Sequence, residues 1–279
     1  MLSDRFPAAR RGIAISAHIS GGNIGTLVVP FIGYWVIGAV GWQGALAAFG
    51  IPALVVGVLI LLLVHEDHSA YRAAALEAGP VLAQLGAVLR RSDIRWILLA
   101  SLAAAGGRGL NIAAPFMLLY LEGPLGFDEA TISLLYGLLL VGSVIGPLLA
   151  GWISDRFGRR RTLIAYYVLS ALGIVLFVLA GSSLVLLVPL LLPFGTAVFS
   201  ESPVLQAYLA DRSAGPMRDV AFAVYFTVAF GVGALWGLII GWIVEGPGYQ
   251  PAFMVMAASF VVAGLLIAAV REDGSGAPA

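Results

Sequence analysis

Long apolar stretches alternate with short polar connectors along the whole chain. A helix that crosses a bilayer needs about 20 mostly apolar residues. Eight stretches reach this length, and they cover residues 13–37, 42–64, 94–120, 129–153, 162–180, 184–207, 220–244 and 252–270. Barrel strands would instead alternate in polarity over segments of about 10 residues. The pattern therefore predicts an all-α integral membrane protein with eight transmembrane helices.

The connectors between these stretches predict the orientation of the chain. Four connectors are short and hold no arginine, at residues 38–41, 121–128, 181–183 and 245–251, and such short connectors favour antiparallel neighbouring helices. The opposite connectors and the chain ends hold Arg5, Arg10, Arg11, Arg72, Arg90, Arg91, Arg95, Arg156, Arg159, Arg160, Arg161, Arg212, Arg218 and Arg271. Membrane proteins keep basic residues on the cytoplasmic side. We therefore expect a multi-pass protein of the cell (inner or plasma) membrane with both termini in the cytoplasm.

One connector is long, at residues 65–93. Its second half predicts a helix over residues 80–91, with an apolar face formed by Val81, Leu82, Leu85, Val88 and Leu89. We expect this segment to be a cytoplasmic linker whose helix lies at the membrane interface, and a partner-binding role is the alternative. Residues 272–279 are expected to form a disordered cytoplasmic tail.

The composition supports a membrane protein and excludes other classes. The chain is 61% hydrophobic and 11% charged, whereas a soluble domain is about 25% charged. It has no cysteine, which excludes disulfides and cysteine metal sites, and its net charge of zero argues against a nucleic-acid partner. It has no P-loop, which favours an ion gradient over ATP hydrolysis as an energy source. We expect no cofactor and no metal.

An internal repeat appears when the chain is compared with itself at an offset of 207 residues. Matched pairs include Asp4 with Asp211, and also Arg11 with Arg218, Trp35 with Trp242, Gly41 with Gly248 and Gln43 with Gln250. Parallel repeats are typical of transporters. One repeat unit contains six spans, so the chain is expected to be the last eight helices of a twelve-helix protein. Residues 1–64 would then end the first bundle, and residues 94–271 would form the complete second bundle.

The connector after residue 150 carries a recognisable motif. Residues 151–161 read Gly-Trp-Ile-Ser-Asp-Arg-Phe-Gly-Arg-Arg-Arg. This resembles the G-x-L-x-D-R-x-G-R-(R/K)-x loop of the major facilitator superfamily (MFS), with Ile153 in place of Leu. The resemblance implies an MFS-type helical bundle and a cytoplasmic gating loop that holds the two halves together when the transporter faces outward. Its candidate residues are Gly151, Asp155, Arg156, Gly158, Arg159 and Arg160. A cluster that only sets membrane orientation is the alternative.

A second, partial motif lies in the first stretch. Gly25, Pro30 and Gly33 are spaced as in the G-x-x-x-G-P-x-x-G-G motif of antiporters in the same family, but Val29 and Tyr34 replace two of its glycines. The resemblance implies antiport. The alternative is a helix kink with close packing.

Two ionisable residues lie inside the predicted spans, where a charge is costly and usually functional. Arg108 follows Gly106 and Gly107 and precedes Gly109, so we expect a weakened helix there. At 1.5 Å per residue it lies about 21 Å from the cytoplasmic end of its span. Arg108 is a candidate anchor for a carboxylate or phosphate of the substrate. The alternatives are pairing with an acid on a helix outside this chain, or snorkelling to the outer interface.

Glu201 is the second ionisable residue. It lies six residues from Ala207, or about 9 Å from the cytoplasmic end of its span. The axial gap to Arg108 would then be about 10 Å, so we expect no direct pair between the two. Glu201 is a candidate proton carrier, and the alternative is a latch onto Arg156 or Arg159.

These features together predict a secondary active transporter that moves a small solute by alternating access, with proton-coupled efflux as the leading mode. Asn111, Tyr136 and Tyr225 are further candidates for substrate binding. The alternatives are uptake of a small organic anion or a truncated, non-transporting membrane protein. We find no catalytic pair for an intramembrane enzyme. The expected partners are a small-molecule substrate, protons and the lipid bilayer.

Overall fold

The computed structural model describes residues 6–63, 80–213 and 216–270, and these residues form helices and no strands. The long helices are α2 (Ala8–Leu63), α4 (Val81–Arg90), α5 (Ser92–Ala104), α6 (Ala114–Glu122), α7 (Glu129–Phe157), α8 (Arg159–Ala180), α9 (Leu184–Val198), α10 (Glu201–Arg212), α11 (Pro216–Phe226), α12 (Leu235–Glu245) and α13 (Tyr249–Ala268). The predicted all-α class is confirmed. The first half of the predicted linker and the tail at 272–279 lie outside the described residues.

Seven segments of the described chain are long and apolar enough to cross a membrane. They correspond to seven of the eight predicted stretches. The remaining stretch, at residues 13–37, lies in the first part of α2. Three of the spans are built from two helices each, because α5 leads into α6, α9 into α10, and α11 into α12.

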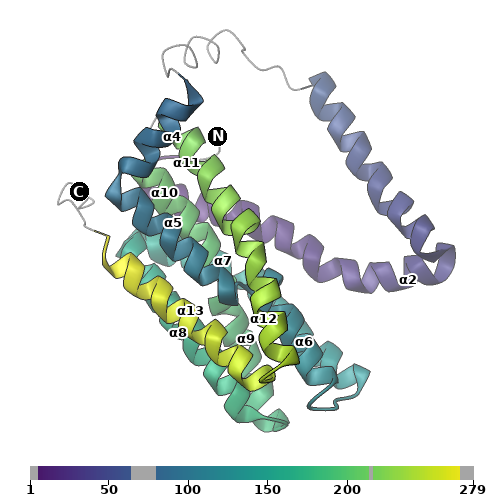
Figure 1. The fold of residues 1–279 in the computed structure, drawn as a ribbon. Coiled ribbons are helices and arrows are strands. Elements are labelled where there is room, and N and C mark those ends of the chain that lie inside the picture. The colour runs from purple at the N-terminus through teal and green to yellow at the C-terminus, as the bar shows by residue number, and fades with distance from the viewer. Residues whose placement is uncertain (1–5, 64–79, 214–215, 271–279) are drawn as a thin grey trace.

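Helix α2 bends at Gly41, where φ is 70° and ψ is 173°. A positive φ is accessible to glycine at little cost because glycine has no Cβ. Gly248, its partner in the internal repeat, has nearly the same backbone, with φ 105° and ψ −177°. Instead of the expected tight hairpin, the two parts of α2 form an open V, and the second part extends away from the bundle (Figure 1). Its most apolar window has no buried residue within the described chain.

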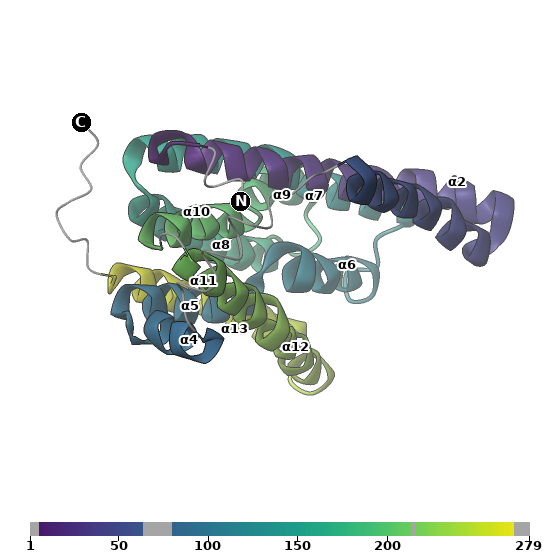
Figure 2. The same cartoon turned by 90° about the horizontal axis from the view of Figure 1, so that it is seen from above.

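The remaining helices pack side by side around one core, as both views show (Figures 1 and 2). Tyr120, Phe177 and Phe253 meet edge to face, with ring centroids 5.3–5.8 Å apart. These rings come from α6, α8 and α13 and tie the ends of those helices together. Aromatic contacts of this geometry contribute beyond their buried area.

Helix α7 has clear start and stop signals. The Asp128 carboxylate accepts hydrogen bonds from the backbone N–H and the hydroxyl of Thr131, both at 2.9 Å. These bonds cap the helix and lower the pKa of the Asp128 carboxyl below its usual range. The helix ends at Gly158, where φ is 92°, and α8 begins at the next residue. A positive φ at Gly158 thus lets the chain turn sharply from α7 into α8.

Helices α7 and α9 cross with their backbones in contact. A Cβ added to Gly195 would lie 2.2 Å from the carbonyl oxygen of Leu139, and one added to Gly142 would lie 2.4 Å from the backbone N of Thr196. Small residues at such crossings let membrane helices approach closely.

We expect Gly195→Ala to destabilise the protein by about 1–3 kcal/mol, because the added methyl group meets rigid backbone. Gly137→Ala is the matched control on α7, since no atom lies within 4 Å of the position of its Cβ. Unfolding in detergent, followed by circular dichroism, measures both variants. Equal stability of the two variants would contradict the close crossing.

Candidate functional site

The span that contains Arg108 is interrupted at this residue. Helix α5 tightens into a 3₁₀ turn (Ala105–Gly107), Arg108 itself is extended (φ −59°, ψ 129°), and a π-helical turn (Gly109–Ala113) leads into α6. A Cβ on Gly107 or Gly109 would lie 2.5 Å from the ring of Phe260 or Phe199, respectively. The expected weakening of the helix by glycine is confirmed, and it brings aromatic rings against the backbone.

The Arg108 side chain points into the bundle and is 5% exposed. Its Nε donates to Glu201 Oε1 at 2.6 Å, and its terminal nitrogens donate to the carbonyl oxygen of Ala229 at 2.9 Å and to the carbonyl and hydroxyl of Ser101 at 3.1 and 3.2 Å. The guanidinium also lies 5.3 Å from the centre of the Phe230 ring, a cation–π distance. We call Ser101, Arg108, Tyr167, Glu201 and Ala229 the core cluster.

Glu201 lies at a second interruption. Helix α9 ends at Val198, and α10 begins at Glu201 after two residues. The N-terminal end of a helix favours a negative charge. The carboxylate is 1% exposed, and its second oxygen accepts a hydrogen bond from the Tyr167 hydroxyl at 3.2 Å. Both oxygens of this buried acid are therefore bonded.

Ala229 lies at a third interruption. Between α11 and α12 the chain forms a π-helical turn (Thr227–Gly231) and a 3₁₀ turn (Val232–Ala234). Irregular backbone at membrane depth needs internal hydrogen-bond partners. Arg108 supplies one such partner to the Ala229 carbonyl. One arginine thus connects three interrupted spans.

The expected separation of Arg108 and Glu201 is wrong. It assumed that the span of Glu201 ends at Ala207, but α10 continues to Arg212. Five more residues place Glu201 about 7.5 Å deeper, and the long arginine side chain covers the remaining gap. Arg108 therefore pairs with an acid inside the described chain, and the two oxygens of Glu201 bind Arg108 and Tyr167.

The other predicted substrate residues are not all brought to this cluster. Tyr225 is fully buried, and its hydroxyl lies 3.3 Å from the hydroxyl of Ser202, the neighbour of Glu201. Tyr136 is half-buried against the core, and Asn111 is exposed. A role of Tyr136 or Asn111 in binding stays a prediction.

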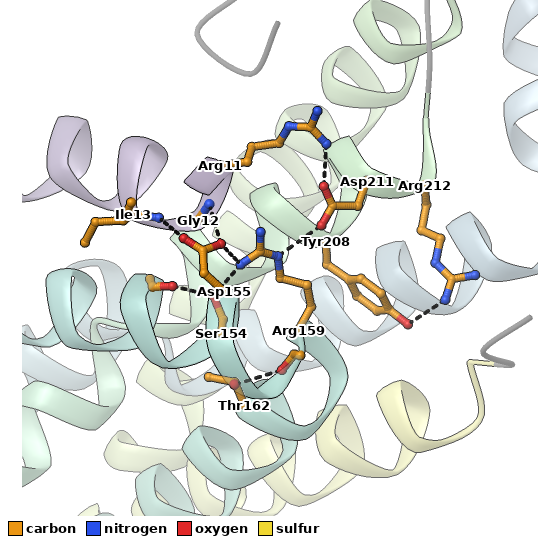
Figure 3. Close-up of polar contacts among 12 residues, drawn as sticks. Arg11, Gly12, Ile13, Ser154, Asp155, Arg159, Thr162, Tyr208, Asp211 and Arg212 are labelled. Atoms are coloured by element: carbon orange, nitrogen blue, oxygen red, sulfur yellow. Dashed lines mark hydrogen bonds and ion pairs between the residues drawn. The ribbon is translucent and has the colours of Figure 1, made fainter. Parts of the chain in front are cut away.

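A second polar cluster joins the start of α2 to the α7–α8 loop (Figure 3). The Asp155 carboxylate accepts hydrogen bonds from the backbone N–H groups of Gly12 at 3.0 Å and Ile13 at 2.9 Å. Arg159 forms an ion pair with Asp155 and donates to Asp211 at 3.0 Å. Arg11 pairs with the same Asp211. We call Arg11, Gly12, Ile13, Ser154, Asp155, Arg159 and Asp211 the loop cluster.

Two glycines allow the close contact at this cluster. A Cβ on Gly12 would lie 2.4 Å from a terminal nitrogen of Arg159, and one on Gly151 would lie 2.5 Å from the hydroxyl of Ser16. The absence of a side chain at Gly151 therefore lets α2 and α7 approach closely.

The remaining arginines of the motif bind elsewhere. Arg160 donates to the carbonyl of Ile267 at 3.3 Å and to that of Ala268, so it holds the last turn of α13. The Arg156 guanidinium lies 5.8 Å from the centre of the Trp152 ring and 5.7 Å from that of Phe157.

The partial antiporter motif lies on α2. No atom lies within 4 Å of a Cβ position on Gly25 or Gly33, and the bend of α2 is at Gly41. Close packing at these two glycines is therefore not seen among the described residues. Antiport stays a prediction.

Asp211, Ser101 and Tyr167 belong to the two clusters but were not predicted as site residues. Asp211 carried a signal, because the internal repeat pairs it with Asp4. Ser101 and Tyr167 are ordinary residues within apolar runs, and only their contacts identify them.

The sequence profile described as Major Facilitator Superfamily matches residues 1–110 and 102–278. The chain belongs to this superfamily. It is 24% identical over 280 residues to the cis,cis-muconate transport protein of Acinetobacter baylyi, and the match covers 95% of this chain and 65% of that protein. It is 25% identical over 289 residues to a probable sulfoacetate transporter of Cupriavidus necator, covering 93% and 65%.

The fold is similar to that of a solved transporter structure. A bacterial homologue of the iron transporter ferroportin, crystallised in an outward-facing state, aligns with TM-score 0.71 and 15% identity. The match covers 95% of this chain and 65% of that one. The chain spans about 55–65% of the length of the curated relatives it matches.

We expect Glu201→Leu to lower the free energy of unfolding by about 3–5 kcal/mol, because it leaves the buried Arg108 charge without its partner. The free energy of unfolding should fall less in the double variant Arg108→Met/Glu201→Leu than in Glu201→Leu alone, because neither charge of the pair remains. Equilibrium unfolding in detergent measures each variant. The ion pair would be contradicted if the double variant lost as much free energy of unfolding as the single variants Arg108→Met and Glu201→Leu lose together.

We expect Asp155→Asn to speed amide hydrogen exchange at residues 12–13 by about tenfold, because the charge-assisted hydrogen bonds to α2 are worth roughly 1.5 kcal/mol. Exchange read by mass spectrometry measures the change. Arg161→Gln in the same loop is the control and should leave exchange at residues 12–13 unaltered. Equal exchange in both variants would rule out Asp155 as the anchor of α2.

Proposed function

We propose that this chain acts in secondary active transport of a small solute by alternating access. The supporting observation is the asymmetry of the contact between α2 and α7. At one end Asp155 and Arg159 hold the start of α2 against α7. Toward the other end the same two helices border an apolar hollow of about 460 Å³, lined by Leu27, Val28, Ser133, Leu134, Gly137, Leu138 and Val141.

This asymmetry corresponds to an outward-facing arrangement if the arginine-rich side is cytoplasmic, as the positive-inside rule predicts. The loop cluster would then close the cytoplasmic end. The ion pair that joins α2 to α10 is partly exposed, with Arg11 and Asp211 side chains 13% and 25% exposed. Exposed pairs are weak and can be broken at small cost, as a gate that opens in every cycle requires. The more buried pair of Arg159 and Asp155, 7% and 9% exposed, joins α8 to α7 and would stay intact.

Proton coupling is proposed for Glu201. It is a buried acid paired with an arginine, and protonation would break the ion pair. The loss of one charge would leave Arg108 without its partner and would loosen the three interrupted spans that it connects. Proton-coupled efflux follows from this switch if the partial antiporter motif on α2 also works as in the family.

Uptake of a small organic anion is the second candidate. Two relatives are named for muconate and sulfoacetate, which are organic anions. Arg108 offers a guanidinium that binds carboxylates in a two-point geometry. Since Glu201 occupies it in this structure, an anionic substrate would have to take the place of Glu201. Of the two candidates, the named relatives favour the anion.

We expect proteoliposomes that contain the purified chain to accumulate radiolabelled cis,cis-muconate when an inward proton gradient is imposed. Glu201→Gln should remove the effect of the gradient, because the side chain can no longer exchange a proton. Arg108→Ala should abolish accumulation, because the anchor is lost.

Four outcomes separate the candidates. Unchanged muconate transport in Arg108→Ala would exclude Arg108 as the anchor. Proton movement across the membrane in the direction opposite to that of muconate would favour proton-coupled efflux. A folded chain that moves no substrate under any gradient would favour a non-transporting membrane protein. Covalent conversion of muconate would indicate an enzyme instead.

A further inference from the structure

One face of α2 carries a row of small and polar residues along α7. Gly12, Ser16, Ser20 and Asn23 are spaced by three or four positions, so they share one helix face. We call this row the seam. It runs from the loop cluster toward the apolar hollow, and three of its members contact α7 through polar atoms or backbone.

Asn23, the last member of the seam, binds a carbonyl of α7 that lacks its helical hydrogen-bond donor. In a regular helix the carbonyl of Ser143 would accept from the N–H of residue 147. That residue is Pro147, which has no N–H and so leaves the carbonyl without its helical donor. The Asn23 side-chain amide donates to this same carbonyl at 2.7 Å. A side chain of α2 thus replaces a backbone donor missing from α7.

The contact made by Ser20 differs from that of Asn23, because its carbonyl acceptor keeps a helical donor. Ser20 Oγ donates to the carbonyl of Val144 at 2.9 Å. The helical donor to that carbonyl is Leu148, which has a normal N–H. The Ser20 bond is therefore an addition to a carbonyl that already has a donor, whereas the Asn23 bond supplies a donor that is otherwise missing. In hydrocarbon a carbonyl without a donor costs several kcal/mol, so the Asn23 contact should matter more.

A third seam residue shows that this interface is not fully satisfied. The hydroxyl of Ser16 is buried and has no hydrogen-bond partner among the described residues. Buried polar atoms without partners are rare and call for an explanation. A surface that faces water in another state of the molecule would explain it, because the hydroxyl would then be hydrated.

We propose that Asn23 is the positioning residue that fixes α2 on α7, through the carbonyl that Pro147 leaves free. It lies between the closed loop cluster and the apolar hollow, where the two helices must keep contact while either end opens. This pivot role rests on the proposed alternating access. The replacement of the missing Pro147 donor by Asn23 does not.

A double-mutant cycle tests the contact itself. We expect Asn23→Leu to lower the apparent Tm in detergent by about 2–4 °C for each kcal/mol lost, because it removes the donor at similar side-chain size. Pro147→Ala restores the N–H of residue 147 and so supplies the carbonyl from within α7. In the Pro147→Ala background, Asn23→Leu should lower Tm by less than half as much.

Ser20→Ala is the matched control for the cycle. The carbonyl that Ser20 binds keeps its Leu148 donor in either background, so the effect of Ser20→Ala on Tm should be the same with and without the Pro147→Ala substitution. An effect of Asn23→Leu that is equal in both backgrounds would overturn the proposal. The proposal is supported if the Pro147→Ala background reduces the effect of Asn23→Leu on Tm but leaves the effect of Ser20→Ala unchanged.

A distance measurement tests the pivot. The chain has no cysteine, so spin labels can be placed without removing native residues. Ile32→Cys on α2 and Leu134→Cys on α7 replace side chains that are 47% and 56% exposed. We expect Asn23→Leu to broaden the electron–electron distance distribution between these labels by about twofold or more, because the register of the two helices is no longer fixed. An unchanged distribution would overturn the pivot role. Neither experiment depends on transport, so a chain that fails to move muconate would still give a clear answer.

Discussion

A bilayer offers no water to an exposed N–H or C=O group, so each interruption of a spanning helix needs a partner inside the protein. Within residues 80–213 and 216–270, three spans are interrupted, and all three meet at Arg108. Its guanidinium donates to Glu201 at the start of α10, to Ala229 in the π-helical turn after α11, and to Ser101 on its own span. Arg108 thus supplies a hydrogen-bond partner at each of these three interruptions.

The two polar clusters differ in burial, and this difference sets what each can do. The Arg108 and Glu201 side chains are 6% and 1% exposed, so separating them strands a charge in a low-dielectric interior. The Arg11 and Asp211 side chains are 13% and 25% exposed, so water can compensate them when they part. Separating Arg108 from Glu201 therefore costs more than separating Arg11 from Asp211, the ion pair that joins α2 to α10.

The seam on α2 runs from the loop cluster toward the apolar hollow. At Gly12, which has no side chain, the backbone of α2 meets the Asp155 carboxylate. At Asn23 a polar side chain makes the contact with α7 instead. Pro147 has a consequence beyond its own helix, since the carbonyl it leaves free becomes a binding point for α2. A proline in a transporter span is usually explained by a kink, but here its missing N–H also sets the register between two helices.

Features that depend on local composition can be read from the chain. The apolar runs, the one-sided arginines and the Asp155–Arg159 motif predicted the helical class, the spans and the loop. The partners of the buried charges depend on how distant helices pack. Arg108 and Glu201 are 93 residues apart, and their depths were misjudged because the length and interruption of a helix depend on packing. Asp211 and Asn23 look ordinary in sequence. Their roles arise only when another helix places a charged side chain or a donor-free carbonyl beside them.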